Sequence, residues 1–478
     1  MSGIAERLDR IDWSKLARRL HGAVVQPGDE RMLLAAKQFS AGKPLAFPRA
    51  LLRCERLDDI RASLDFVVSE DIPFSVRSGG HCYGDLSSSD SVIIDLSEMN
   101  QIRIEGESVG VGPGALATDL SRDLAAAGRV IPLGGCPRVA IGGLSLAGGF
   151  GYLGRRYGLT TDQVEQMQVV TPEGKVLEVD ADSEPDLFWA LRGAGTAGLG
   201  IVTELVLRTS PLCEMTVCYA RWPLQEAASL INRWQQWAPE ASDRIILELG
   251  MTGPDFPEQA PYIELFGVVV GDQPDTTSHL REVRRSLGPQ AGELQTWPAS
   301  GDVAAAYLVG LLNHKMQDAW RPSRPFREIG YQFTRSDFFE EPLSLDAIRD
   351  CVANFEADRR YAQFREMEFV PWGGEYARPN PSASFIHRAP RTLIRHTVTL
   401  GAHSTQELRD HGRDWVDASQ LSLRRHANGH SYQGYADLRL DNWAHAYYGE
   451  SYSRLRRTKS HYDPQNVFHH ARSIRPME

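Results

Sequence analysis

The sequence predicts an α+β fold made of two unlike parts. Over the first 210 residues, short β-branched strands alternate with helices, and glycine is concentrated there. Beyond residue 211 the glycine content falls, and the pattern predicts a helix at residues 224–237 and alternating strands at 262–270 and 392–400. Strands of alternating polarity beside amphipathic helices indicate an antiparallel sheet that carries helices. The chain has 478 residues, which is enough for up to three domains.

Local apolar runs predict the elements of the first part and the tail. Residues 72–76 and 92–96 are short, apolar runs typical of buried strands, so the Arg77–Asp85 stretch between them lies on a loop at a sheet edge. Residues 166–180 form a hairpin around the turn sequence PEGK. The tail, Leu438–Ile474, is aromatic and basic, and we expect one helix closed by an Asp-Pro turn.

Composition excludes several classes of function. The net charge is −10, which gives little electrostatic attraction for nucleic acid or an anionic membrane surface. No run of about 18 apolar residues and no signal peptide is evident, so we expect a soluble, cytoplasmic protein. The six cysteines include no C-x-x-C pair, which argues against a disulfide scaffold or a zinc site. No metal is expected.

One tempting motif fails on its context. Residues Gly149–Gly154 match G-x-G-x-x-G, with Glu173 about 20 residues further on, as in dinucleotide-binding folds. That fingerprint must follow a strand and open a helix. Here the preceding residues are broken by glycine, and Gly158 interrupts the segment that would have to be the helix. We therefore reject a nicotinamide site of that type.

Three glycine-rich loops nevertheless indicate a cofactor. They are Arg77–Asp85, Pro132–Asp162 and Arg192–Leu207. Glycine lets the backbone approach a ligand closely, and successive N–H groups form a concave surface that attracts anions. Such a cradle suits a pyrophosphate and a flat ring system better than a metal or a peptide.

The motifs in these loops resemble those of the vanillyl-alcohol-oxidase-type flavoproteins, in the berberine-bridge-enzyme-like branch of FAD-linked oxidases. The matching residues are Arg77-Ser78-Gly79-Gly80-His81, Gly135-Cys136-Pro137, Gly142-Gly143, Gly148-Gly149-Phe150-Gly151, Arg192-Gly193-Ala194-Gly195 and the closing signature YYGESYSRLRRTKSHYDPQNVFHHARSIRP. The resemblance implies a bipartite PCMH-type FAD-binding domain at residues 1–210 and 431–478. An α+β substrate domain with an antiparallel sheet, residues 211–430, would interrupt it. The middle of the chain matches weakly.

The resemblance also implies FAD attached by two covalent bonds, through His81 and Cys136. For these additions the histidine must be neutral and the cysteine partly ionised. The further residues that we expect at the cofactor are Arg77, Ser78, Gly79, Gly80, Gly142, Gly143, Gly148, Gly149, Gly151, Gly200, Ile201 and Val202.

For the catalytic base the resemblance points to the tail. The family pattern Tyr-x-Asn-Tyr-x-Asp occurs here as YQGYAD, and we expect Tyr432 to act as base with Tyr435 as its partner. Gly434 replaces the usual asparagine, which removes an amide anchor. The strand RTLIRHTVTL, where the plant branch has a glutamate base, contains no acid, so His396 is the fallback base.

The expected activity is oxidation of a bulky hydroxylated metabolite, such as an alcohol, sugar or hemiacetal. Hydride passes to FAD, and dioxygen accepts the electrons and becomes hydrogen peroxide. Amine oxidation or oxidative cyclisation on the same flavin is the alternative within enzymes. The alternative to an enzyme is a metabolite-binding resistance protein without turnover. Its best support is Gly434, which stands where the family pattern has asparagine. A monomer or homodimer is expected.

Overall fold

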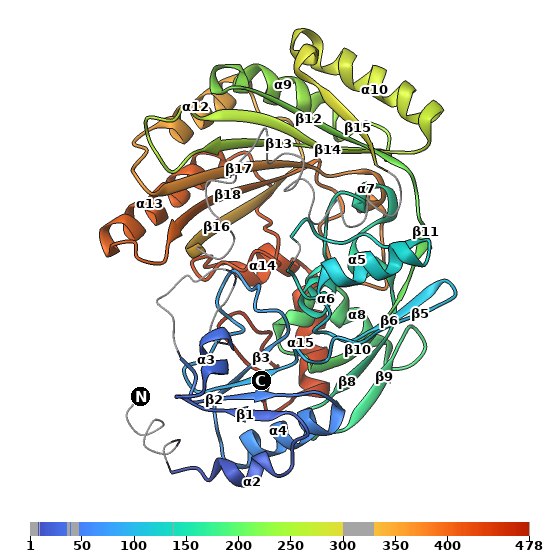
Figure 1. Ribbon diagram of the computed structural model, residues 1–478, viewed down its shortest axis with the longest axis vertical. Coiled ribbons are helices and arrows are strands. Elements are labelled where there is room, and N and C mark those ends of the chain that lie inside the picture. The colour runs from blue at the N-terminus through green and yellow to red at the C-terminus, as the bar shows by residue number, and fades with distance from the viewer. Residues whose placement is uncertain are drawn as a thin grey trace.

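The computed structural model describes residues 8, 10–35, 39, 47–136, 138–299 and 329–477. Two halves lie one above the other in Figure 1. The lower half contains three small sheets, and the upper half contains one sheet of seven antiparallel strands. This mixture of helices and largely antiparallel sheets confirms the predicted α+β class.

The lower half is built around a four-stranded and a five-stranded sheet, with strand orders β1-β2-β4-β3 and β5-β6-β10-β8-β9. The strands are β1 (Ala23–Val25), β2 (Ala50–Arg53), β3 (Phe74–Arg77), β4 (Val92–Asp95), β5 (Ile102–Glu105), β6 (Ser108–Val111), β8 (Val164–Val170), β9 (Val176–Val179) and β10 (Ile201–Arg208), with the short pair β7 (Arg129–Val130) and β11 (Ser210–Pro211). The helices are α2 (Trp13–Ala17), α3 (Glu30–Ala35), α4 (Leu57–Ser69), α5 (Ala117–Ala126), α6 (Ile141–Ala147), α7 (Gly154–Tyr157) and α8 (Pro185–Ala194).

The upper sheet has the strand order β15-β12-β14-β13-β17-β18-β16. Its strands are β12 (Met215–Pro223), β13 (Ile245–Gly253), β14 (Tyr262–Val270), β15 (Gln295–Ala299), β16 (Ile329–Phe339), β17 (Gln363–Pro371) and β18 (Thr392–Gly401). Helices α9 (Ala227–Trp237), α10 (Gln273–Leu287), α12 (Leu345–Glu356) and α13 (Gln406–Arg424) cover the face that points away from the lower half (Figure 1). The opposite face looks toward the lower half, and the site lies there.

The tail returns to the lower half. It forms α14 (Trp443–Tyr448) and α15 (Ser451–Tyr462), two helices where the sequence predicted one. The break falls at Gly449, whose φ of 47° lies in the left-handed region that glycine adopts without strain. Leu455 and Ile474 share a hydrophobic core with Leu187 of α8.

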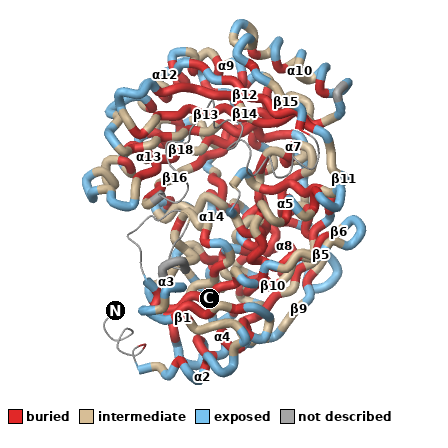
Figure 2. Tube along the Cα trace, viewed as in Figure 1, coloured by how far each residue is buried: buried red, intermediate tan, exposed pale blue. Residues whose placement is uncertain are grey.

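Burial agrees with this arrangement. The strands of both halves are largely buried and the helix surfaces alternate between buried and exposed, as Figure 2 shows. No helix in the described part of the chain is both long and apolar enough to cross a bilayer. The domain boundaries near residues 210 and 430 stay a prediction.

Candidate active site

A cavity of about 410 Å³ lies between the two halves. Its lower wall consists of the loop after β3, the loop that leads into α6, and the start of β10. Its upper wall consists of side chains from β13, β17 and β18, and the tail segment 432–436 closes it. The sequence-predicted residues that line it are Ser78, Gly79, Gly80, His81, Cys136, Gly142, Gly143, Gly151, Gly200, Ile201, Val202, Tyr432 and Tyr435.

The loop after β3 is fixed by its neighbours on both sides. A Cβ on Gly79 would lie 2.7 Å from the Cβ of Ala140, so only glycine lets this loop pack against the start of α6. Arg77 is buried and does not line the cavity. Its guanidinium donates to the Ser87 carbonyl at 3.2 Å and the Ser88 hydroxyl at 3.2 Å. The Arg77 side chain therefore anchors the loop from behind, and a contact with the cofactor stays a prediction.

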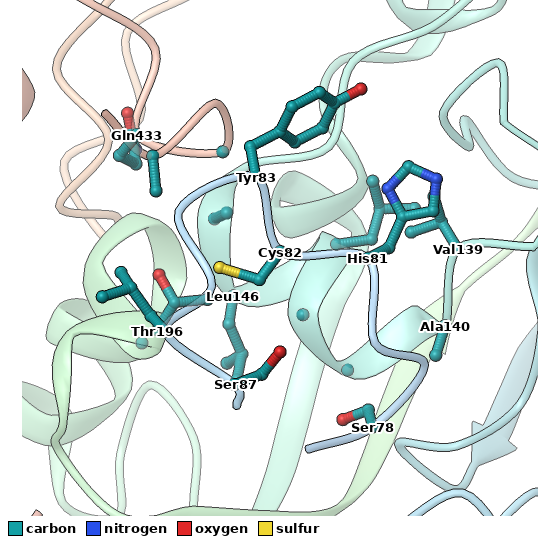
Figure 3. Close-up of a pocket in the computed structure, with 18 of the residues that line it drawn as sticks. Ser78, His81, Cys82, Tyr83, Ser87, Val139, Ala140, Leu146, Thr196 and Gln433 are labelled. Atoms are coloured by element: carbon teal, nitrogen blue, oxygen red, sulfur yellow. The ribbon is translucent and has the colours of Figure 1, made fainter. Parts of the chain in front are cut away.

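His81 lines the cavity and lies beside Val139 in Figure 3. Its ring stacks on Phe39, with 3.7 Å between ring centroids and 11° between planes. Its Nε2 is buried and has no hydrogen-bond partner among the residues that the structure describes. Burial lowers the pKa of the imidazole to about 4, so the ring is neutral at pH 7. A neutral ring with an unpartnered nitrogen meets the predicted requirement for bonding to a flavin.

Cys136 lines the cavity opposite the upper sheet, and the adjoining Pro137 lies outside the described residues. Burial raises the pKa of the Cys136 thiol to about 11, while the Arg395 cation opposes that rise. The thiol is therefore protonated at neutral pH, unlike the partly ionised thiol expected from the sequence. Its attachment to a flavin would require a proton acceptor.

Gly148 and Gly149 are not among the residues that line the cavity, and their role at the cofactor stays a prediction. The backbone N–H of Gly149 donates to the Tyr432 hydroxyl at 2.9 Å. A Cβ on Gly148 would lie 2.8 Å from the Phe385 ring. These glycines let the loop after α6 pack against aromatic side chains from the other half. Because the loop follows a helix and not a strand, the rejection of a dinucleotide fingerprint is consistent with the structure.

The two tyrosines of the tail pack edge to face, with ring centroids 5.2 Å apart. Burial raises the pKa of Tyr432 to about 12, although the Gly149 N–H opposes the rise. Tyr435 packs edge to face on Tyr83 at 5.0 Å, and burial raises its pKa well above the usual range. Both hydroxyls are therefore protonated at neutral pH. A Cβ on Gly434 would lie 2.4 Å from the Tyr432 ring, so its lack of a side chain makes room for that ring.

His396 lies on the other face of the sheet, which corrects its role as fallback base. It neighbours Arg395 on β18, and successive side chains of a strand point to opposite faces. Its Nδ1 shares a hydrogen bond of 2.8 Å with the Ser419 hydroxyl of α13. His396 is fully buried and absent from the cavity lining. It is a core residue.

Three charged residues that the sequence interpretation missed line the upper wall: Glu248, Glu368 and Arg395. Arg395 Nε lies 2.9 Å from a Glu368 carboxylate oxygen, and the two residues are register partners across β17 and β18. An acid is therefore present beside the strand RTLIRHTVTL, on the neighbouring strand. The available signal was the segment FREMEFVP, in which Glu366 and Glu368 alternate with apolar residues.

FAD fits the residues of the lower wall. Gly142 and Gly143 of α6 line the cavity, and around Gly143 a Cβ would meet nothing within 4 Å. Gly200 directly precedes β10, and its φ of 146° is a backbone conformation that favours glycine at this edge of the cavity. Together with the unpartnered Nε2 of His81, these features make a backbone-lined cradle beside one reactive nitrogen.

Comparison with known proteins agrees with this site. Residues 48–180 match the FAD binding domain model, and residues 431–475 match the model named berberine and berberine like. The chain is 28% identical to (R)-6-hydroxynicotine oxidase of Paenarthrobacter nicotinovorans, over 97% of this chain and 99% of that protein. It is 24% identical to chitooligosaccharide oxidase of Gibberella zeae, over 90% and 87%. The solved BBE-like 1 of Physcomitrella patens superposes with a TM-score of 0.84 at 22% identity, covering 98% of this chain and 100% of that one.

Proposed function

We propose that this protein oxidises a hydroxylated small molecule, with Glu368 as the proton acceptor. The chain belongs to the berberine-bridge-enzyme-like FAD-linked oxidoreductases. The observation that carries the proposal is the Glu368–Arg395 ion pair, which faces the glycine loops across one cavity. The similarity to FAD-linked oxidoreductases favours an enzyme over a binding protein without turnover.

The chemistry that FAD supplies when bound is acceptance of a hydride from the substrate carbon and delivery of the electrons to dioxygen, giving hydrogen peroxide. An alcohol that loses hydride must also lose its hydroxyl proton, so a base within hydrogen-bond reach is required. Arg395 holds Glu368 beside the cavity with its carboxylate paired to a guanidinium. An ionised carboxylate accepts a proton at neutral pH, whereas a phenol with a pKa of about 12, such as Tyr432, is already protonated.

The tyrosines then have positioning roles. Tyr432 binds the Gly149 N–H and so ties the tail to the loop after α6. The Tyr435 ring packs under the Arg395 guanidinium, 5.6 Å from its centroid. We propose that Tyr435 and Tyr83 exclude water from the carboxylate. We also propose that His81 and Cys136 attach the FAD covalently, because both face the cavity from separate loops.

Amine oxidation is the second candidate. It is favoured by the upper wall, where the carboxyl groups of Glu248 and Glu368 face the guanidinium of Arg395. The other guanidinium that lines the cavity, that of Arg472, donates to the backbone carbonyls of Asp437 and Leu438. Amine oxidation is also favoured by the similarity to (R)-6-hydroxynicotine oxidase, named for an amine. The name of chitooligosaccharide oxidase supports the first candidate in the same way. Dioxygen as acceptor and the oligomeric state stay predictions.

Anaerobic mixing separates the candidates. The purified holoenzyme would be mixed with chitooligosaccharides, aryl alcohols and 6-hydroxynicotine, and bleaching of the flavin followed. We expect an alcohol or sugar to bleach the flavin, and hydrogen peroxide to form when air is admitted. Bleaching by 6-hydroxynicotine alone would establish the amine candidate instead. Recolouring in air without peroxide would exclude an oxidase.

A further inference from the structure

One buried carboxyl group on the upper wall has no bonding partner in the described ranges of the chain. Glu248 of β13 is 4% exposed and lines the cavity. Among the residues that the structure describes, none forms a hydrogen bond or ion pair with its carboxyl group. Burying a carboxyl group without a partner is costly, so such groups are normally paired. An unpaired carboxyl that faces a cavity indicates a ligand that pairs with it.

The surroundings of Glu248 carry an excess of negative charge. Arg395 lies 2.9 Å from Glu368 and 3.9 Å from Glu366, so its one positive charge is shared by two carboxylates. Glu248 lies close enough to this group that burial and the charge of Glu368 raise its pKa well above the usual range. Tyr152, which lines the cavity on the opposite wall, adds no cation. Three carboxyl groups thus face one guanidinium.

The cavity of about 410 Å³ is itself the space for an occupant, since Glu248 is one of its lining residues. Two residues further along β13, Gly250 pairs in register with Glu368 on one side and with Glu264 on the other. Gly250 leaves no open space there, because the Phe266 ring lies 3.1 Å from the place where a Cβ of Gly250 would be. Glu264 itself is satisfied by the Tyr219 hydroxyl at 3.1 Å. The unsatisfied group is therefore Glu248, at the edge of the ion pair.

We propose that Glu248 is the anchor of a cation subsite, which binds an ammonium group of the substrate while the oxidised carbon lies near Glu368 and the glycine loops. This subsite rests on the proposed function, since both use the same cavity, and it names the substrate class as a cationic metabolite. An ammonium group supplies both the missing hydrogen-bond donors and the missing positive charge. The raised pKa of Glu248 favours its protonated form in the empty site, and a bound ammonium group would favour the ionised form and release that proton. A neutral hydroxyl would supply a donor and no charge that favours ionisation.

The test uses two probes of the same shape and different charge. Benzylamine is a cation at neutral pH and benzyl alcohol is neutral, and binding of each to the holoenzyme is measured from the change in the flavin spectrum. We expect the wild-type protein to bind benzylamine about tenfold more tightly or better. Glu248→Gln keeps the size of the side chain and should reduce the preference to about twofold or less.

Glu264→Gln is the matched control, because Glu264 lies on the same sheet face, is bonded to Tyr219 and does not line the cavity. It should keep the preference for benzylamine. Equal affinity for the two probes in the wild type, no binding of either probe, or a preference that survives in Glu248→Gln would each overturn the proposal. The ratio of the two affinities in the wild-type protein tests the proposal even if the variant does not fold.

The outcome is separable from that of the proposed function. The titration measures binding and needs no turnover. A clear preference for benzylamine, with no bleaching by any alcohol, would uphold the subsite and overturn alcohol oxidation. Bleaching of the flavin by alcohols, with equal affinity for the two probes, would uphold alcohol oxidation and overturn the cation subsite.

Discussion

Replacing Glu368 by glutamine tests the assignment of the base most directly. Glu368→Gln keeps the shape of the side chain, removes the negative charge and leaves a group that cannot accept a proton at neutral pH. Loss of a positioned base typically lowers the rate by about a hundredfold to ten-thousandfold. Since each tenfold is about 1.4 kcal/mol, the barrier should rise by roughly 2.7–5.4 kcal/mol.

The same change also acts on stability, because it leaves Arg395 without its nearest carboxylate. The side chains of Arg395 and Glu368 are 12% and 18% exposed, so the pair is largely buried. Breaking a buried pair costs about 3–5 kcal/mol when the remaining charge is left alone. Here Glu366 remains 3.9 Å from the guanidinium, so we expect a loss toward or below the low end of that range. The flavin content should survive.

The assay is anaerobic stopped-flow reduction of the flavin by a substrate that bleaches the wild-type holoenzyme. The matched comparison is Tyr432→Phe, which keeps the ring and removes the acceptor for the Gly149 N–H. That change should cost about 1–3 kcal/mol of stability through the unsatisfied buried donor, with a small effect on the reduction rate. A wild-type rate in Glu368→Gln together with a collapse in Tyr432→Phe would refute our reasoning and make the tyrosine the base.

Three further outcomes are expected. The variants His81→Ala and Cys136→Ala should each keep the flavin bound to the protein after acid precipitation, and the double variant should release it. Release of the flavin by either single variant would contradict attachment through two covalent bonds. Gly434→Ala should lower the melting temperature, because the new Cβ would lie 2.4 Å from the Tyr432 ring and overpacking costs about 1–3 kcal/mol. An unchanged melting temperature would mean that the Tyr432 ring moves aside without cost. Burial lowers the pKa of His396 to about 3, so unfolding takes up a proton at that residue and stability should fall as pH drops below about 6.5. His396→Gln should flatten that dependence in denaturant titrations by up to about 1.4 kcal/mol per pH unit, and an unaltered slope would show that this histidine does not contribute.

Local patterns predicted the parts of this fold that depend on local physics. The strand expected at residues 262–270 is β14 itself, because a run of apolar and β-branched residues carries its own signal. The loop that carries His81 was placed correctly, since two short apolar strands flank it. The tail was predicted as one helix because the break depends on the backbone conformation of Gly449, which composition alone does not reveal.

The upper wall depended on long-range pairing, and there the sequence was less informative. Glu368 and Arg395 meet because β17 and β18 pair in one register, and a shift by one residue would turn one of them toward the helices. The strand of Arg395 therefore contains no acid of its own, because the acid lies directly across from it on β17.

A usable signal was nevertheless present in β17. Met367 and Phe369 are buried in the core beneath the helices, so Glu366 and Glu368 must share the opposite face of the strand. A strand with one face in the core and two carboxylates on the other needs solvent, a partner cation or a ligand on that second face. Arg395 satisfies part of that need. Glu248 lines the same wall and has no partner within the described part of the chain, so its carboxyl group is left for a substrate.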